Sequence, residues 1–182
     1  MTAREWFRKK DNLFLLAILL TGFVLRFYRL GYQSFWVDEM HTMKQTDPTL
    51  TSWSWMFDSL GRDQHPPLFY ILERCLFTLF GTSEFLGRLL PALFGTLSIW
   101  AMYLLGKEIG TKKLGLIAAA LTCLNYFCLY YSQEARDYML VFLGATLSYL
   151  YFVRMIRSPD KTNRWLYTLF AIITVYSHYY GI

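Results

Sequence analysis

The longest clue to the architecture of this chain is the apolar run RLLPALFGTLSIWAMYLL, residues 88–105. After its first residue it contains no charged side chain, and Leu, Phe, Trp, Met, Ile and Ala make up most of it. A helix of roughly 17–25 predominantly apolar residues is long enough to cross the hydrocarbon core of a bilayer. The stretch therefore predicts a transmembrane helix at about 88–106.

The composition of the whole chain agrees with a membrane protein. Of its 182 residues, 55% are hydrophobic and only 17% are charged, whereas soluble domains average about 25% charged residues. The net charge of +5 could indicate a nucleic-acid partner. However, Lys and Arg cluster beside apolar runs, as the positive-inside rule requires of cytoplasmic membrane flanks. Nucleic-acid binding is therefore not expected.

The apolar runs predict an all-α fold, a polytopic transmembrane bundle of about five spans. The first run begins after a basic N-terminus and ends in an interfacial cluster at 26–29, without a small-residue cleavage site, so a retained helix is expected instead of a signal peptide. A long first external loop follows it, at 31–87. The predicted spans are 12–30, 88–106, 114–130, 138–153 and 165–181.

Segment 66–80 within this loop is apolar but has Glu73 and Arg74 at its centre. A central charge costs at least about 2.5 kcal/mol on insertion scales. We therefore expect an amphipathic surface helix, started by Pro66 and Pro67, rather than a span.

The charges predict the orientation. With five spans and a cytoplasmic N-terminus, the cytoplasmic segments are 1–11, 107–113 and 154–164, and they contain eleven of the eighteen Lys and Arg residues. Loop 31–87 and the short link 131–137 then share the non-cytoplasmic face. The chain ends where the fifth span reaches this face, so we expect it to be the N-terminal part of a longer protein.

Two adjacent carboxylates, Asp38 and Glu39, follow the first span in an aromatic setting. Partial desolvation and their mutual repulsion would raise the basicity of one of them, as a general base requires. They could instead bind a divalent cation, or stabilise the N-terminus of a helix that begins near Met40.

Two further groups carry polar side chains. His65, in the run 63–67, directly precedes two prolines and could be a ligand, a hydroxyl-binding group or a proton carrier, or simply a loop residue. Link 131–137 contains Glu134, Arg136 and Asp137, where Arg136 could bind a phosphate; the alternative is a solvated turn with belt tyrosines. Arg88 could reach a lipid phosphate or extend to the interface.

The remaining candidate residues predict no site. The three cysteines, at positions 75, 123 and 128, form no CxxC pattern and predict neither a disulfide framework nor a zinc site. His41 and His178 are isolated in the sequence, and neither is assigned a role.

Four motifs occur in order along the chain: FWVDE at 35–39, HPPLFY at 65–70, RLLPALFG at 88–95 and YSQEARDY at 131–138. Together they resemble the GT-C membrane glycosyltransferases, in the branch related to protein O-mannosyltransferases and lipid A aminoarabinose transferases. The resemblance implies a polyprenyl-phosphate sugar as donor. It also implies a catalytic aspartate in the first external loop, and Asp38, with Glu39 beside it, resembles that aspartate. The resemblance further implies that the second external loop, with Glu134, Arg136 and Asp137, completes the site. Family members typically have more than ten spans.

The expected mechanism is an inverting transfer at the non-cytoplasmic face of a plasma or inner membrane. Asp38 takes the proton of an acceptor hydroxyl, on a lipid, glycan or protein, and Arg136 stabilises the departing phosphate. His65 and Arg88 are expected to bind substrate. No cofactor is certain, although Asp38, Glu39 and His65 could gather around a divalent cation.

Two other functions compete with this one. A non-catalytic scaffold or partner subunit could keep the fold without turnover. A transporter would place ionisable residues inside the spans, and the five predicted spans have almost none. The sequence indicates neither the sugar nor the acceptor.

Overall fold

The computed structural model describes residues 3–62 and 65–179, with side chains from Lys10 onward. This part of the chain is all-helical and contains no strand, which confirms the predicted class. Asp63, Gln64 and the end of the fifth predicted span lie outside the described residues. The helices are α1 (Ala3–Phe27), α2 (Val37–Thr46), α3 (Trp53–Leu60), α4 (Leu68–Phe80), α5 (Glu84–Ile109), α6 (Lys112–Leu124), α7 (Tyr126–Ser132), α8 (Tyr138–Arg157) and α9 (Lys161–Ser177).

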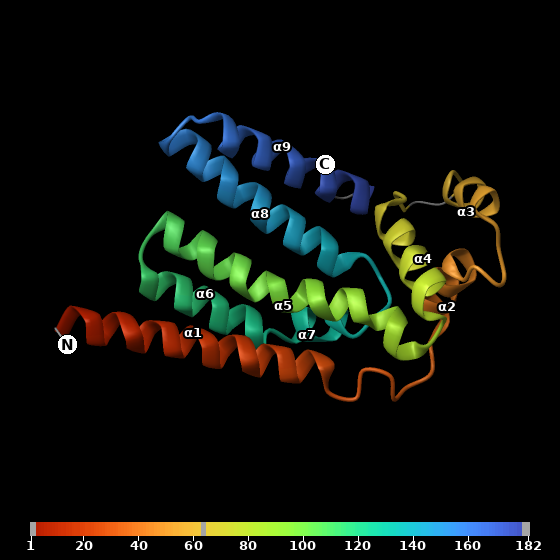
Figure 1. Ribbon diagram of the computed structural model, residues 1–182, viewed down its shortest axis with the longest axis horizontal. Coiled ribbons are helices and arrows are strands. Elements are labelled where there is room, and N and C mark those ends of the chain that lie inside the picture. Colours follow the sequence, from red (N-terminus) through yellow and green to blue (C-terminus); the bar gives the residue numbers. More distant parts are fainter. Residues whose placement is uncertain (1–2, 63–64, 180–182) are drawn as a thin grey trace.

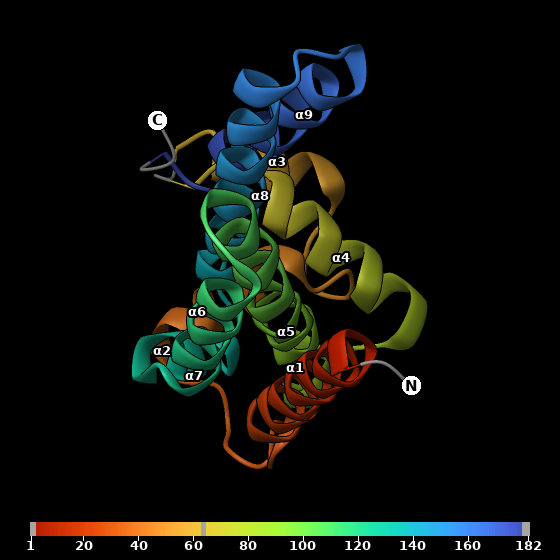
Figure 2. The same cartoon turned by 90° about the vertical axis from the view of Figure 1, so that its left-hand side faces the viewer.

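The long helices α1, α5, α6, α8 and α9 lie side by side as a bundle (Figure 1). Helix α5 runs through its middle, between α1 and α8 (Figure 2). Helices α5 and α6 approach closely where two glycines face each other, since a Cβ on Gly106 would lie 2.9 Å from the Cα of Gly115. The short helices α2, α3 and α4 and the link 133–137 gather at one end of the bundle, and the α5–α6 and α8–α9 turns lie at the other (Figure 1).

Among the residues that the structure describes, two helices, α5 and α8, are long and apolar enough to cross a membrane, and the pair α6 and α7 adds a third candidate if this bent pair is one span. The described part of α1 carries Lys10, Asp11 and Arg26, and α9 has only 17 residues. The predicted count of five spans therefore stays a prediction.

The bend of 58° between α6 and α7 is held by a buried cation. Arg26 of α1 is fully buried and donates to the last carbonyls of α6, at 3.1 Å from Thr122 and 3.3 Å from Cys123. The side chain of Asn125 then caps α7 by accepting from the backbone N–H of Cys128, at 3.0 Å. Arg26, part of the predicted interfacial cluster, thus lies between helices, where the broken helix offers it carbonyl partners.

Helix α4 begins directly after Pro66 and Pro67, as predicted, and it is not a candidate span. However, the two charges at its centre are not on a surface, since Glu73 and Arg74 are both buried. Arg74 donates to the Thr51 hydroxyl at 3.0 Å and lies 4.9 Å from the centre of the Trp53 ring. Within the described residues, neither oxygen of Glu73 has a hydrogen-bond partner.

The replacement Glu73→Gln is expected to stabilise the protein at high pH. Burial raises the pKa of the Glu73 carboxyl well above its ordinary value, so the folded state binds this proton more tightly than the unfolded state. The native protein therefore loses stability as the pH rises from the unfolded pKa towards the folded one. At pH 8 we expect the free energy of unfolding of the variant to exceed that of the wild type by about 1–3 kcal/mol. Near pH 4 the two proteins should be equally stable. Thermal unfolding in detergent at both pH values would measure this. An equal gain at both pH values would contradict the role of ionisation.

Candidate functional site

A buried ion pair joins α2 to α5 at the end of the bundle where the short helices lie. Arg88 of α5 binds both oxygens of Glu39 of α2, with Nε 2.7 Å from Oε1 and Nη2 2.6 Å from Oε2. Arg88 also donates to the backbone carbonyls of the loop between α1 and α2, at 3.1 Å from Leu30 and 2.8 Å from Gln33. The backbone N–H of Ala135 donates to Glu39 Oε1 at 2.9 Å.

These contacts give Glu39 and Arg88 an anchoring role. The carboxylate of Glu39 is fully buried and the Arg88 side chain is only 6% exposed. The guanidinium and the backbone amide of Ala135 occupy the carboxylate, which leaves it poorly placed to take a proton from substrate. These contacts favour a positioning role for both side chains, while the catalytic role of Glu39 and the substrate-binding role of Arg88 stay predictions from the sequence.

Asp38, beside Glu39, is differently placed. Its side chain is half-buried, and its carboxylate makes no hydrogen bond to the described part of the chain. Its backbone carbonyl accepts from Nη1 of Arg136 at 3.3 Å. The carboxylate is therefore available to a ligand, while the backbone beneath it is fixed to the 133–137 link.

Glu134 lies in a pocket of about 410 Å³ at the end of α1. Its side chain is buried, and Oε1 has no hydrogen-bond partner among the residues described. Burial raises the pKa of the Glu134 carboxyl, a hydrogen bond with Tyr130 opposes this, and the negative charges of Glu39 and Asp38 raise it further. Glu134 and Asp38 are thus close enough to influence each other electrostatically.

The same pocket contains residues that were not expected in a site from the sequence. Arg29 lies where α1 turns into the loop, with φ of 53°, and its guanidinium carbon is 3.5 Å from the centre of the exposed Tyr32 ring. A positive φ is uncommon for residues other than glycine. Nothing in the local sequence predicts this angle at Arg29, so only the structure reveals it. The aromatic residues of the pocket are Tyr28, Tyr32, Trp36 and Tyr130.

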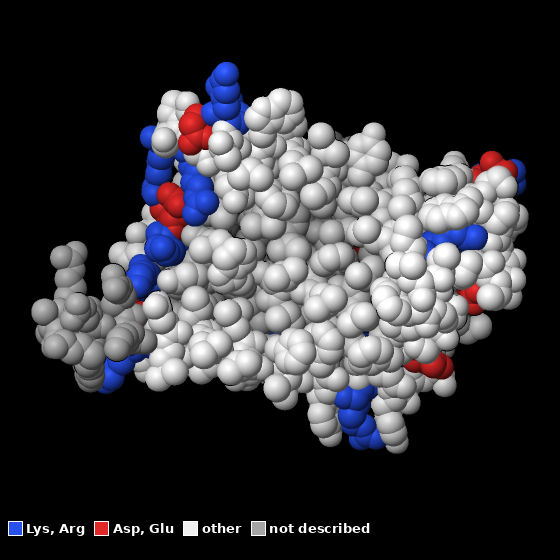
Figure 3. Space-filling view, in the orientation of Figure 1, with Lys and Arg blue, Asp and Glu red and all other residues white. Residues whose placement is uncertain are grey.

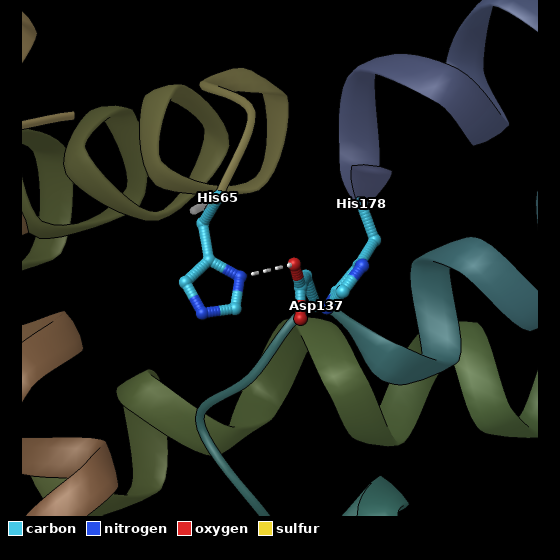
Figure 4. Close-up of side chains that lie close together, drawn as sticks. All are labelled: His65, Asp137 and His178. Atoms are coloured by element: carbon cyan, nitrogen blue, oxygen red, sulfur yellow. Dashed lines mark ion pairs between the residues drawn. The ribbon is translucent and has the colours of Figure 1, made fainter. Parts of the chain in front are cut away.

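On the other side of the link, three side chains from three separate segments converge (Figure 4). His65 precedes α4, Asp137 precedes α8 and His178 follows α9. The Nδ1 atom of His65 lies 3.4 Å from Oδ2 of Asp137. The rings of His65 and His178 are arranged edge to face, with their centroids 5.1 Å apart. One nitrogen or oxygen atom from each of the three side chains lies within 4.8 Å of the others.

Arg136 connects this cluster to Asp38. Its Nη2 lies 3.0 Å from Nε2 of His65, while its Nη1 reaches the Asp38 carbonyl. The structure thus brings Asp38, Arg136, His65 and Asp137 together. The cation site predicted from Asp38, Glu39 and His65 does not form among the described residues, because Glu39 faces Arg88 and His65 faces Asp137.

The fold and these contacts define an integral membrane protein with a polar, partly buried site at one end of a helical bundle. Residues 64–179 match the family described as dolichyl-phosphate-mannose-protein mannosyltransferase. This match covers more than half of the chain, and the protein belongs to this family. Asp38 and Glu39 lie before the matched residues, whereas His65, Arg88, Glu134 and His178 lie within them.

The chain is also similar to an uncharacterized protein of Aquifex aeolicus (strain VF5), with 28% identity over 151 residues. The alignment covers 76% of this chain but only 30% of that protein, so the chain spans less than a third of the relative's length. No solved structure matches it.

Proposed function

We propose that this chain contributes the first part of a GT-C catalytic module, which transfers a sugar from a polyprenyl phosphate to an acceptor hydroxyl at the non-cytoplasmic face. The observation that carries the proposal is the convergence of Asp38, Glu134 and Arg136 at one end of the bundle. Two segments, separated by almost a hundred residues, thus supply a free carboxylate, a second buried carboxylate and a guanidinium to one place.

The distribution of charge supports the orientation. Figure 3 shows Lys and Arg gathered along the end of the bundle opposite the site, over the α5–α6 and α8–α9 turns. Among these residues are Lys112, Lys113, Arg154 and Arg157. Because basic residues favour the cytoplasmic flanks of membrane helices, we place that end, and the N-terminus with it, in the cytoplasm. The site then faces the opposite side of the membrane, in a multi-pass protein.

The pocket that contains Glu134 suits the head group of a lipid-linked sugar. Arg29 supplies a guanidinium that can bind a phosphate by charge-assisted hydrogen bonds. The exposed rings of Tyr28, Tyr32 and Trp36 offer apolar faces to a sugar ring, and the free oxygen of Glu134 can accept from a sugar hydroxyl. The polyprenyl tail would remain in the lipid beside α1.

The proposed reaction is one displacement. The acceptor hydroxyl oxygen attacks the anomeric carbon, its proton moves to the carboxylate of Asp38, and the bond from that carbon to the phosphate oxygen breaks. Arg29, which lines the pocket, and Arg136 would stabilise the negative charge of the departing lipid phosphate. Since the base and the leaving group act on opposite faces of the sugar, the anomeric configuration inverts.

The test uses the full-length protein in proteoliposomes with a ¹³C-labelled polyprenyl-phosphate hexose and candidate lipid, glycan and peptide acceptors. We expect a product whose anomeric configuration, assigned by NMR, is opposite to that of the donor. A product with retained configuration would exclude the single displacement. A folded protein that transfers the sugar to none of these acceptors would favour the non-catalytic scaffold.

A further inference from the structure

We propose that His65, Asp137 and His178 form a binding site for one divalent transition-metal ion, with Zn²⁺ as the best match. The sequence assigned no role to His178, and the transfer step proposed above uses none of the three side chains. The inference therefore stands or falls independently of the proposed function.

The first argument is the unsatisfied polarity of the cluster. Asp137 is only 2% exposed, yet neither of its oxygens has a hydrogen-bond partner in the described part of the chain. The Nδ1 atom of His65, 3.4 Å away, is also buried without a hydrogen bond. A buried carboxylate that lacks good partners is costly, and a cation between these atoms would satisfy it.

The second argument is the chemistry of the three ligands. Two imidazoles and one carboxylate suit Zn²⁺ and related ions, whereas Mg²⁺ and Ca²⁺ prefer sites built only from oxygen. Zinc ligands lie at about 2.0–2.2 Å from the ion, which places tetrahedral ligand atoms about 3.5 Å from one another. The present separations, up to 4.8 Å, require the side chains to close by about 1 Å. Three protein ligands would leave a fourth position open for water.

Arg136 is expected to oppose metal binding at His65. An arginine only donates hydrogen bonds, so Nε2 of His65, 3.0 Å from Nη2 of Arg136, accepts and the ring proton lies on Nδ1. A metal at Nδ1 needs this proton to move to Nε2, where it would face the guanidinium. Metal binding should therefore displace Arg136 from His65, and Arg136 should weaken metal binding through both its charge and its hydrogen bond.

The test begins with the full-length protein, stripped with a chelator and then titrated with Zn²⁺ alone. We expect one tightly bound equivalent per chain, measured by mass spectrometry of the metal after dialysis and by competition with a chromophoric chelator. His178→Ala should weaken binding by about 100-fold or more, because removal of an outer-shell partner alone costs about 10–100-fold. Arg136→Gln should tighten it by about tenfold, because an amide oxygen can accept from the protonated Nε2.

The matched control is His41→Ala, which removes an exposed histidine of α2 and should leave the affinity unchanged. Should the His178 variant fail to fold, the visible spectrum of Co²⁺ bound to the wild type provides a second measurement. A spectrum like that of the hexa-aqua ion, a wild type that retains no zinc after dialysis, or unchanged affinity in His178→Ala would each overturn the proposal.

Discussion

Replacement of Arg88 by Ala is expected to lower the free energy of unfolding by about 3–5 kcal/mol. The variant leaves the Glu39 carboxylate buried without its cation, and such an uncompensated charge is the costly part of breaking a buried pair. The backbone carbonyls of Leu30 and Gln33 lose their donors at the same time. Since domains are stable by only about 5–15 kcal/mol, we expect a large loss of folded protein. Thermal unfolding in detergent would measure it.

Two comparisons make this test specific. Arg88→Lys keeps the positive charge but cannot bind both oxygens of Glu39. Its loss of stability should therefore be smaller than that of Arg88→Ala. Arg62→Ala removes an exposed arginine in the turn that follows α3 and should change stability by no more than about 0.5 kcal/mol. If Arg88→Ala unfolds at the wild-type temperature, the Glu39–Arg88 pair is not the anchor that we describe.

The variant Asp38→Asn is expected to lower the rate of sugar transfer by about 10²–10⁴-fold, the usual contribution of a general base. Asparagine has nearly the same shape but cannot accept the proton of the acceptor hydroxyl. The structure predicts little effect on stability, because only the backbone carbonyl of Asp38 contacts Arg136. Single-turnover transfer by the full-length protein, with the unfolding temperature measured alongside, would separate chemistry from folding.

The matched control for this variant is Asp58→Asn, an exposed carboxylate on α3 that should leave transfer unchanged. Glu39→Gln should instead lower the stability of the protein, because it weakens the ion pair with Arg88. Transfer at the wild-type rate by folded Asp38→Asn would remove Asp38 as the base. The free, buried oxygen of Glu134 would then become the leading candidate.

Amino-acid sequence alone was enough for the class of fold and for the family. Uninterrupted apolar runs such as 89–106 predict helices in a membrane, because a helix of this length satisfies its own backbone hydrogen bonds across the hydrocarbon core. The pair Pro66 and Pro67 marked the start of α4, since proline suits the first turn of a helix. The order of four short motifs identified the family to which the chain belongs.

The roles of individual charges were decided only by tertiary structure. Glu39 and Asp38 are adjacent carboxylates, yet one is enclosed by Arg88 and Ala135 while the other keeps a free carboxylate. Local sequence cannot distinguish them, because the partners of Glu39 come from positions 49 and 96 residues away. His178 joins His65 and Asp137 only because α9 ends beside α8 and the loop before α4. Sequence patterns report the local periodicity of a chain, whereas the environment of a buried charge depends on contacts that folding creates between distant segments.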